Sequence, residues 1–189
     1  MTDAALRYAI YEDLFDLPEH LVGEILNGVL ETYPRPAPRH SRASSSLGGL
    51  FFNPFDKGQN GPGGWWILDE PELHLKADIM VPDLAGWKRQ KMPTLPETAW
   101  FECVPDWVCE VISPSTGRVD RAVKMPLYAH YGVQYLWIVD PDLKTLETYE
   151  LHEEESGNKW LLCSTLKDDQ AVSLAPFDAI EFDLSILWG

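Results

Sequence analysis

Two acids and a lysine are the residues of this sequence best suited to chemistry. Asp83 follows a proline, and Glu110 interrupts the apolar run 106–112. Lys124 comes one helical turn after Asp120. Hydrolysis of a phosphodiester needs a hard cation held by oxygen ligands, a water that attacks phosphorus, and positive charge near the phosphoryl group. Two carboxylates and an ammonium group can supply these needs where the fold brings them together.

The elements that must position the two acids are strands. A short strand, broken by a proline, is predicted over residues 79–84, and the run 106–112 predicts a strand buried on both faces. Adjacent strands would bring Asp83 and Glu110 to one end of the sheet. The backbone carbonyl of Val111 would then be available as a third metal ligand.

Lys124 falls on a predicted helix that follows the second of these strands. Residues 113–117 form a turn, and residues 119–131 have helical character except at Pro126, which removes a backbone hydrogen bond and predicts a kink or restart beside it. At positions i and i+4, Asp120 and Lys124 face one side of this helix.

The rest of the chain predicts an α+β fold around a mixed central sheet, with residues 1–189 forming a single domain. The Asn27-Gly28 pair between two apolar runs is typical of a hairpin with a type I′ turn. The expected elements are a short helix over 9–17, hairpin strands 21–26 and 29–33, a helix over 41–52, a strand over 65–75, a loop over 88–105, a strand over 134–139, and a hairpin of strands 146–151 and 159–166 separated by the polar segment 153–158.

The net charge of −15 opposes indiscriminate binding to DNA, because affinity for a polyanion rests largely on Lys and Arg contacts to phosphate. The basic residues are clustered, however, and two of the three clusters directly follow the proposed catalytic acids. These clusters are Arg35, Arg39 and Arg42; Lys88, Arg89 and Lys91; and Arg118, Arg121 and Lys124. Positive charge near the acids keeps DNA as the expected partner.

The cysteine pattern predicts a reducing compartment. Cys103, Cys109 and Cys163 are odd in number and lack CxxC spacing, which argues against a disulfide framework and against a zinc ribbon. The N-terminal stretch does not combine a basic start with an apolar run, as a secretion signal would. No window approaches the roughly 18 apolar residues of a membrane-spanning helix. We therefore expect a cytoplasmic protein without a membrane partner.

Several motifs together resemble a known family. The most specific is Glu-Val-Ile-Ser-Pro-Ser-Thr at residues 110–116, and Pro82-Asp83 precedes it. Further matches are Glu24 with Asn27-Gly28, His40, Asp120, Lys124, Tyr128, Gly132-Val133, Tyr135 and the run 137–141. Over residues 11–151 the chain resembles the restriction endonuclease-like family of bacterial proteins, in the PD-(D/E)XK nuclease superfamily. The resemblance implies an α/β/α-like core, in which helices flank the mixed sheet, and a divalent-metal site assisted by Glu24.

One position departs from the superfamily pattern. The pattern places a lysine two residues after the strand glutamate, but Ile112 stands there. Some members of the class supply the ammonium group from the following helix, where this chain has Lys124.

Each of these residues also has an ordinary structural explanation. Glu110 could pair with Arg118 or Arg121, Asp83 could be a turn residue, and Lys124 could be an exposed partner of Asp120. The remaining candidates are Glu24 at the metal site and, as contacts to the substrate, His40, Arg42, Ser113, Thr116 and Arg121. Their ordinary explanations are an outer-face position on the hairpin, exposure to solvent, or capping of a helix.

The function expected from these observations is a metal-dependent DNA endonuclease. Asp83 and Glu110 would hold Mg²⁺ or Mn²⁺, Lys124 would orient water or stabilise the phosphoryl charge, and Glu24 would assist. Cutting both strands of a duplex with one site per chain calls for a homodimer. The rivals are a catalytically silent interaction module that keeps the nuclease fold, favoured by the acidity and by Ile112, and a hydrolase of RNA or small phosphodiesters.

Overall fold

The architecture is α+β, with a six-stranded mixed sheet at its centre, in a computed structural model that describes residues 7–155 and 157–189. The strand order of this sheet is β10-β9-β8-β7-β6-β3. β7 and β8 pair in parallel, and every other neighbouring pair in the sheet is antiparallel. The strands are β3 (Trp65–Asp69), β6 (Leu84–Lys88), β7 (Trp107–Val111), β8 (Tyr135–Asp140), β9 (Thr145–Glu154) and β10 (Gly157–Lys167).

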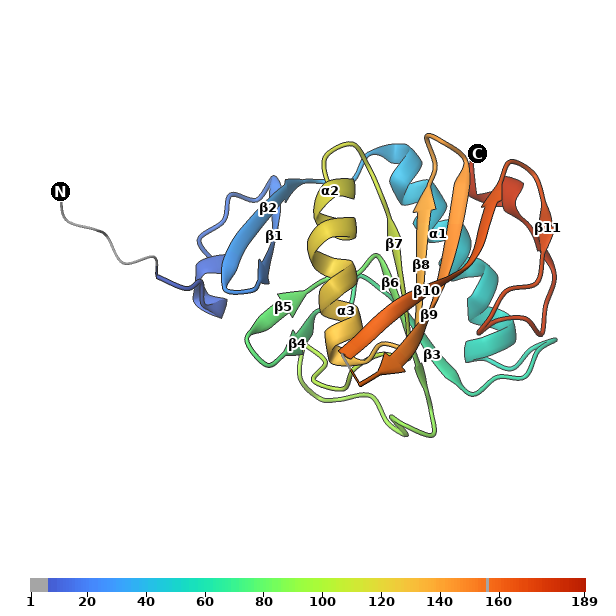
Figure 1. Cartoon of the computed structure of the whole chain (residues 1–189), viewed down its shortest axis with the longest axis horizontal. Helices are drawn as coiled ribbons and strands as arrows, with labels where there is room; N and C mark the ends of the chain where they lie inside the picture. The colour runs from blue at the N-terminus through green and yellow to red at the C-terminus, as the bar shows by residue number, and fades with distance from the viewer. Residues whose placement is uncertain (1–6, 156) are drawn as a thin grey trace.

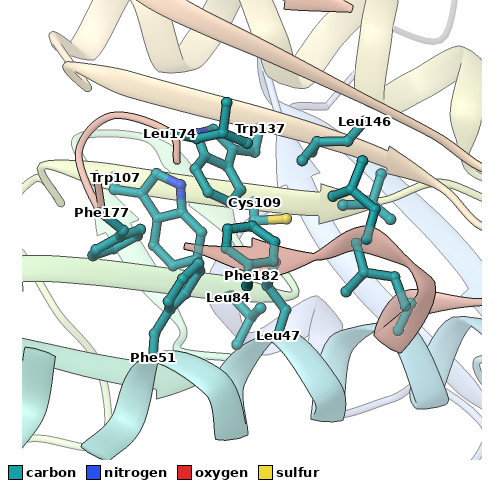
Figure 2. Packing of buried hydrophobic residues seen from close by; sticks show 14 of the residues in the cluster. Leu47, Phe51, Leu84, Trp107, Cys109, Trp137, Leu146, Leu174, Phe177 and Phe182 are labelled. Atoms are coloured by element: carbon teal, nitrogen blue, oxygen red, sulfur yellow. The ribbon is translucent and has the colours of Figure 1, made fainter. Parts of the chain in front are cut away.

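One face of this sheet packs against helix α1 (Pro38–Phe51), which continues as a π-helical turn, η2 (Phe52–Asp56). Alternate residues of the central strands point to this face, among them Trp107, Cys109 and Trp137, and Figure 2 shows Leu47 and Phe51 of α1 reaching toward them. The C-terminal segment closes this core with β11 (Ala171–Val172), β12 (Phe182–Asp183) and the 3₁₀-helix η4 (Leu184–Leu187).

The opposite face carries the helical crossover from β7 to β8, so helices lie on both sides of the central strands (Figure 1). The crossover consists of α2 (Gly117–Val119), the π-helical turn η3 (Asp120–Lys124) and α3 (Met125–Tyr131). The restart expected beside Pro126 is confirmed, and Gly132, with φ of 85°, ends the helix. Within residues 7–155 and 157–189, no helix is long and apolar enough to cross a membrane.

A smaller four-stranded sheet lies beside this crossover, in the order β2-β1-β5-β4. Its strands are β1 (Leu21–Leu26), β2 (Val29–Pro34), β4 (Leu73–Leu75) and β5 (Asp78–Met80). The predicted hairpin is confirmed. Asn27 and Gly28 have φ of 53° and 77°, the two positive values that a type I′ turn requires. Leu26, Leu73 and Met80 pack with the apolar residues of the crossover.

Two predicted strands are wrong because each is divided between the two sheets. The expected strand 65–75 breaks at Glu70, whose φ is 45°, so β3 stays in the large sheet and β4 joins the small one. The expected strand 79–84 likewise separates into β5 and β6 around Pro82, which cannot donate a ladder hydrogen bond. Asp83 therefore stands directly before a strand of the large sheet and does not end a strand.

Other predicted boundaries change less. The helix expected over 9–17 is a 3₁₀-helix, η1 (Tyr11–Leu14), and α1 begins at Pro38, where the fixed φ of proline suits a first helical position. β9 and β10 extend through most of the segment 153–158 expected between them, of which residue 156 lies outside the described part. Cross-strand pairing accommodates these polar residues because they are exposed on both strands.

The core around α1 provides a matched pair for a stability test. Phe51 is fully buried and stacks on Phe177 with ring centroids 4.2 Å apart, whereas its neighbour Phe52 is 42% exposed. Phe51→Ala should lower the free energy of unfolding by about 3 to 5 kcal/mol, because it removes packed apolar area and leaves a cavity. Phe52→Ala should cost less than about 1 kcal/mol. Urea denaturation checks both, and equal losses would contradict the described packing.

Candidate active site

A cavity of about 300 Å³ lies where the two sheets, the start of α1 and the start of the crossover meet. Its walls include Asp83, Glu110 and Lys124, the three residues that the sequence singled out for catalysis. The other residues around it are Val22, Glu24, Tyr33–Ala37, His40, Glu70, Val81, Ser113–Thr116 and Asp120. A larger hollow, of about 620 Å³ beside the N-terminal segment, is lined by none of the predicted site residues.

The strand register brings Asp83 and Glu110 to the same face of the large sheet. β6 and β7 are antiparallel, with Leu84 opposite Cys109, and one step further the same register sets Asp83 opposite Glu110. Directly opposite residues project from the same face of a sheet. That face is the one covered by the crossover, since Val108 and Ile138 beside Glu110 belong to its core. The two acids therefore converge as predicted.

Both oxygens of Asp83 are engaged by neighbouring groups. The backbone N–H of Val111 donates to Oδ2 at 2.7 Å, and Nε2 of His40 lies 3.1 Å from Oδ1. Burial lowers the pKa of His40, but the hydrogen bond and charge of Asp83 outweigh it and raise that pKa above its ordinary value. His40, inside the first turn of α1, thus fixes the carboxylate in place.

Lys124 is the centre of the buried charge network. Its side chain is 3% exposed, and Nζ lies 2.7 Å from Oε1 of Glu110 and 3.0 Å from Oε1 of Glu24. It also donates to the carbonyl oxygen of Val81 at 3.2 Å, and Oε1 of Glu24 accepts the Val81 N–H at 2.6 Å. Burial opposes the charge of the ammonium group, but Glu110 and Glu24 raise the pKa of Lys124 well above its ordinary value. Lys124 is therefore a cation.

The network holds more carboxylates than cations. Glu24, Glu110 and Asp120 surround the single ammonium group of Lys124, and Asp120 lies 3.9 Å from it. Burial, with the other acids, raises the pKa of Glu110 well above its ordinary value even though Lys124 opposes the shift. The hydroxyl of Tyr128 donates to Oε1 of Glu110 at 2.6 Å. Three carboxylates thus share one ammonium group, and a further cation beside them would favour their charged forms.

The oxygen donors fit a hard divalent ion. Among residues 7–155 and 157–189, no group of three or more His, Cys, Asp or Glu side chains is arranged to hold a metal. Mg²⁺ does not require such a group, because it commonly takes one or two carboxylates and keeps water and substrate phosphate as its other ligands. Asp83 and Glu110 bring two carboxylates to the wall of this cavity.

The turn before the crossover places hydroxyl groups on the cavity wall. Oγ of Ser113 lies 2.9 Å from Oγ of Ser115 and 3.2 Å from Oγ1 of Thr116. Thr116 occupies the N-cap position of α2, but its side chain makes no capping hydrogen bond to the helix. Its hydroxyl bonds Asp120 and lowers the pKa of that acid, against the larger effect of burial. Ser113 and Thr116 also accept each other's backbone N–H groups, at 3.3 Å from Thr116 and 3.2 Å from Ser113, which is the reciprocal pattern of a capping box. The capping explanation of these two residues is therefore supported.

Two of the predicted substrate contacts lie outside the cavity. Arg42 is exposed on α1, and Arg121 pairs with Oε2 of Glu147 at 2.6 Å. The alternative partners of Glu110 are also wrong, because Lys124 takes the place expected for Arg118 or Arg121. Lys124 is not the exposed helical lysine that the sequence allowed.

The residues around the cavity that were not predicted as site residues include Tyr33 and Glu70. Tyr128, which donates to Glu110, was not predicted either. Tyr33 could have been found by alternation, since it pairs with Val22, which stands two residues before Glu24 on the same strand. Glu70 carries no local signal, because its place depends on the split between β3 and β4.

Comparison with known proteins identifies the family of this chain. The model of the family described as "Uma2: Putative restriction endonuclease" matches residues 11–186. This chain belongs to the Uma2 family. None of the curated proteins compared with it matches. Membership bears out the restriction endonuclease-like assignment made from the motifs and supports a nuclease at the level of the family.

A solved structure shares the fold of this Uma2 protein. It is the crystal structure of a "putative nuclease belonging to DUF820" from Anabaena variabilis ATCC 29413, with a TM-score of 0.70 and 20% sequence identity. The match covers 94% of this chain and 96% of that one. The likeness confirms the α+β fold with a mixed sheet flanked by helices.

The excess of buried acid predicts a pH-dependent stability. Burial raises the pKa of Asp120 from 3.8 to about 6. Between those values the unfolded chain releases the proton while the folded chain keeps it, so the free energy of unfolding falls as pH rises through this window. Asp120→Asn removes the penalty and should be more stable than the wild type above pH 6, by up to about 3 kcal/mol. The gap should close as pH falls toward 4.

Chemical denaturation at several pH values measures this gap. Asp169→Asn, an exposed control, should show no such pH-dependent difference from the wild type. A gap for Asp120→Asn that widens toward acid would contradict the assignment.

Proposed function

We propose that this Uma2 protein is a metal-dependent DNA endonuclease. Asp83 and Glu110 hold Mg²⁺, or Mn²⁺ in its place, and the carbonyl of Val111 is the third protein ligand. Lys124 acts on the phosphoryl group, and Glu24 assists by holding the ammonium group in position. Three free cysteines, Cys103, Cys109 and Cys163, support a cytoplasmic location.

The single observation that carries the proposal is the position of Lys124. Its Nζ lies 2.7 Å from a carboxylate oxygen of Glu110, although the superfamily position for the lysine is taken by Ile112. A buried lysine beside a strand glutamate is costly unless its charge is compensated, and an apolar residue would often be no less stable there. The retention of this charge in a cavity supports a catalytic role.

The proposed chemistry assigns each residue a separate task. A Mg²⁺ ion bound here would polarise a phosphate oxygen and lower the pKa of a bound water. Lys124 stabilises the negative charge that develops on the phosphoryl group, since its ammonium is fixed before the substrate arrives. Tyr128 and Glu24 orient Glu110 and Lys124, and His40 orients Asp83. Ser113 and Thr116 are near enough to the cavity to contact a phosphate oxygen.

DNA is the substrate that the family description supports, and the excess of acid at the site explains how an acidic protein can act on it. A divalent ion neutralises the carboxylates and attracts the scissile phosphate, so local charge there is reversed while the surface stays acidic. Two copies would be needed to cut both strands of a duplex, so the proposal includes a homodimer. Gel filtration with light scattering measures that state directly.

Metal binding is tested first by calorimetry. Mg²⁺ or Mn²⁺ titrated into the wild type should release or absorb heat, and Glu110→Gln should remove most of it while keeping the volume of the side chain. Glu150→Gln, an exposed position on β9, should bind like the wild type. Negligible heat from all three proteins would favour the catalytically silent interaction module, to which the surplus of acid and Ile112 also point.

Catalysis is tested with Lys124→Met on a panel of DNA and RNA substrates. Loss of a preorganised charge that contacts the transition state should slow cleavage by about 10²-fold or more. The free energy of unfolding should also fall, by about 3 to 5 kcal/mol, because Glu24 and Glu110 lose their buried partner. Circular dichroism establishes whether the variant is folded at the assay temperature.

Lys167→Ala, at an exposed position on β10, is the matched control and should cut normally. A folded Lys124→Met protein that cuts as fast as the wild type would remove the lysine from the mechanism. If the protein cleaves only RNA or only small phosphodiesters, that class of molecule is the substrate in place of DNA.

A further inference from the structure

We propose that Tyr33 and the prolines beside it form a wall that binds a nucleobase, so that the site takes an unpaired nucleotide of single-stranded DNA in preference to an intact duplex. This inference rests on the proposed function, because it names the form of DNA that reaches Asp83, Glu110 and Lys124. It adds Tyr33 to the site as a residue that binds substrate.

The hairpin register places Tyr33 beside the reacting groups. Tyr33 on β2 is directly opposite Val22 on β1, and Glu24 stands two residues further along β1. Directly opposite residues, and residues two apart on a strand, project from one face. Glu24 on that face contacts Nζ of Lys124 at 3.0 Å, and the charges of Glu24 and Lys124 both act on the pKa of Tyr33. The ring of Tyr33 therefore lines the cavity next to the ammonium group.

Two polar atoms around this cavity lack partners within the protein. Oη of Tyr33 and Nδ1 of His40 are both buried, and neither has a hydrogen-bond partner among the described residues. Buried tyrosine hydroxyls usually find a partner, because leaving one unsatisfied is unfavourable. A nucleotide offers acceptors and donors on its base, sugar and phosphate. Both groups therefore lack a partner that the described residues supply.

The surface next to Tyr33 is suited to the flat face of a base. Pro34, Pro36 and Ala37 continue the same wall. These residues present apolar atoms, and the prolines have no N–H to satisfy. Proteins that bind single strands stack successive bases on aromatic rings, an interaction that depends little on sequence. The wall thus offers stacking on one side and the catalytic groups on the other.

The size and burial of the site argue against direct entry of a duplex. The cavity of about 300 Å³ is at the lower end of the range for small-molecule pockets, about 300 to 1,000 Å³. The side chains of Glu110 and Lys124 are each only 3% exposed. A phosphate reaches them only if the attached nucleotide enters the cavity with it. In a duplex that nucleotide must first be unstacked and unpaired, a cost that a single strand avoids.

The charged residues around the cavity also favour contact with only a short stretch of DNA. Binding along a duplex depends on many free Lys and Arg contacts to phosphate. Arg35 lines the cavity, and its guanidinium donates to the backbone carbonyl of Glu19 at 3.0 Å. Outside the cavity, Arg39 is paired with Asp142 at 3.2 Å, and Arg121 is paired with Glu147 at 2.6 Å. With these arginines already bonded within the protein, stacking and the metal-bound phosphate become the main sources of affinity. Such a balance suits one or a few unpaired nucleotides.

Cleavage of matched substrates tests the inference. One fluorescently labelled DNA sequence is offered to the wild type with Mg²⁺ or Mn²⁺ as a single strand, as a full duplex, and as a duplex with a central unpaired loop. The single strand and the loop should be cut at least about tenfold faster than the full duplex, since they need no base flipping. Equal rates on all three substrates would overturn the inference and leave the proposed nuclease function intact.

Variants at residue 33 separate stacking from a structural role. Tyr33→Ala should raise KM for the single strand roughly tenfold while kcat changes little, because stacking on the ring is lost. Tyr33→Phe should restore most of the affinity, since it keeps the ring. Tyr8→Ala, a change at a tyrosine that is 76% exposed and lies outside the cavity, should match the wild type. An unchanged KM for a folded Tyr33→Ala protein would overturn the role of Tyr33.

A binding measurement keeps this result separate from catalysis. The base analogue 2-aminopurine loses fluorescence when it stacks on an aromatic ring, so a single strand carrying it should be quenched by the wild type with Ca²⁺ and by Tyr33→Phe, but not by Tyr33→Ala. Quenching without cleavage of any substrate would defeat the proposed catalysis and support the nucleobase wall. Cleavage without quenching would support the proposed catalysis and overturn the nucleobase wall.

Discussion

The structure of the site depends on one buried ammonium group. Lys124 from the crossover contacts Glu110 of the large sheet, Glu24 of the small sheet and the carbonyl of Val81 between β5 and β6. These contacts join the two sheets and the helix at one point. Because charges removed from water must be compensated, displacing any one partner leaves the others at high energy. The network therefore fixes the relative positions of the elements that carry the proposed catalytic residues.

The same network explains why acids can lie in an otherwise apolar layer. Every residue of β7 is buried, and Glu110 stands among the side chains that pack under the crossover. An isolated carboxylate there would favour its neutral form, and burial does raise the pKa of Glu110. Lys124 and Tyr128 limit this cost but do not remove the excess negative charge. A local loss of stability of this kind is common at functional sites.

The features that the sequence predicted well are those with local causes. The Asn27-Gly28 turn requires two positive φ values, the apolar run around Glu110 has the character of a buried strand, and Pro126 cannot continue a regular helix. The split between β3 and β4 was missed because it follows from which sheet each half joins, and that choice depends on distant residues. The same is true of Glu70, whose place in the site depends on that split, whereas the place of Tyr33 follows from the pairing of the predicted hairpin.

In the proposed function, the crossover supplies the ammonium group that the superfamily pattern places at residue 112. Ile112, two residues after Glu110, is directed to the same face but packs with the apolar residues there. The ammonium group comes instead from the π-helical turn Asp120–Lys124, immediately before the helix restarts at Met125. Single π-helical turns are frequent at functional sites, because they change which side chains face inward. Here Asp120 and Lys124 are both buried, so the turn has brought an acid and a base into the core together. Pro126, by removing one backbone hydrogen bond next to this turn, makes the departure from a regular α-helix less costly.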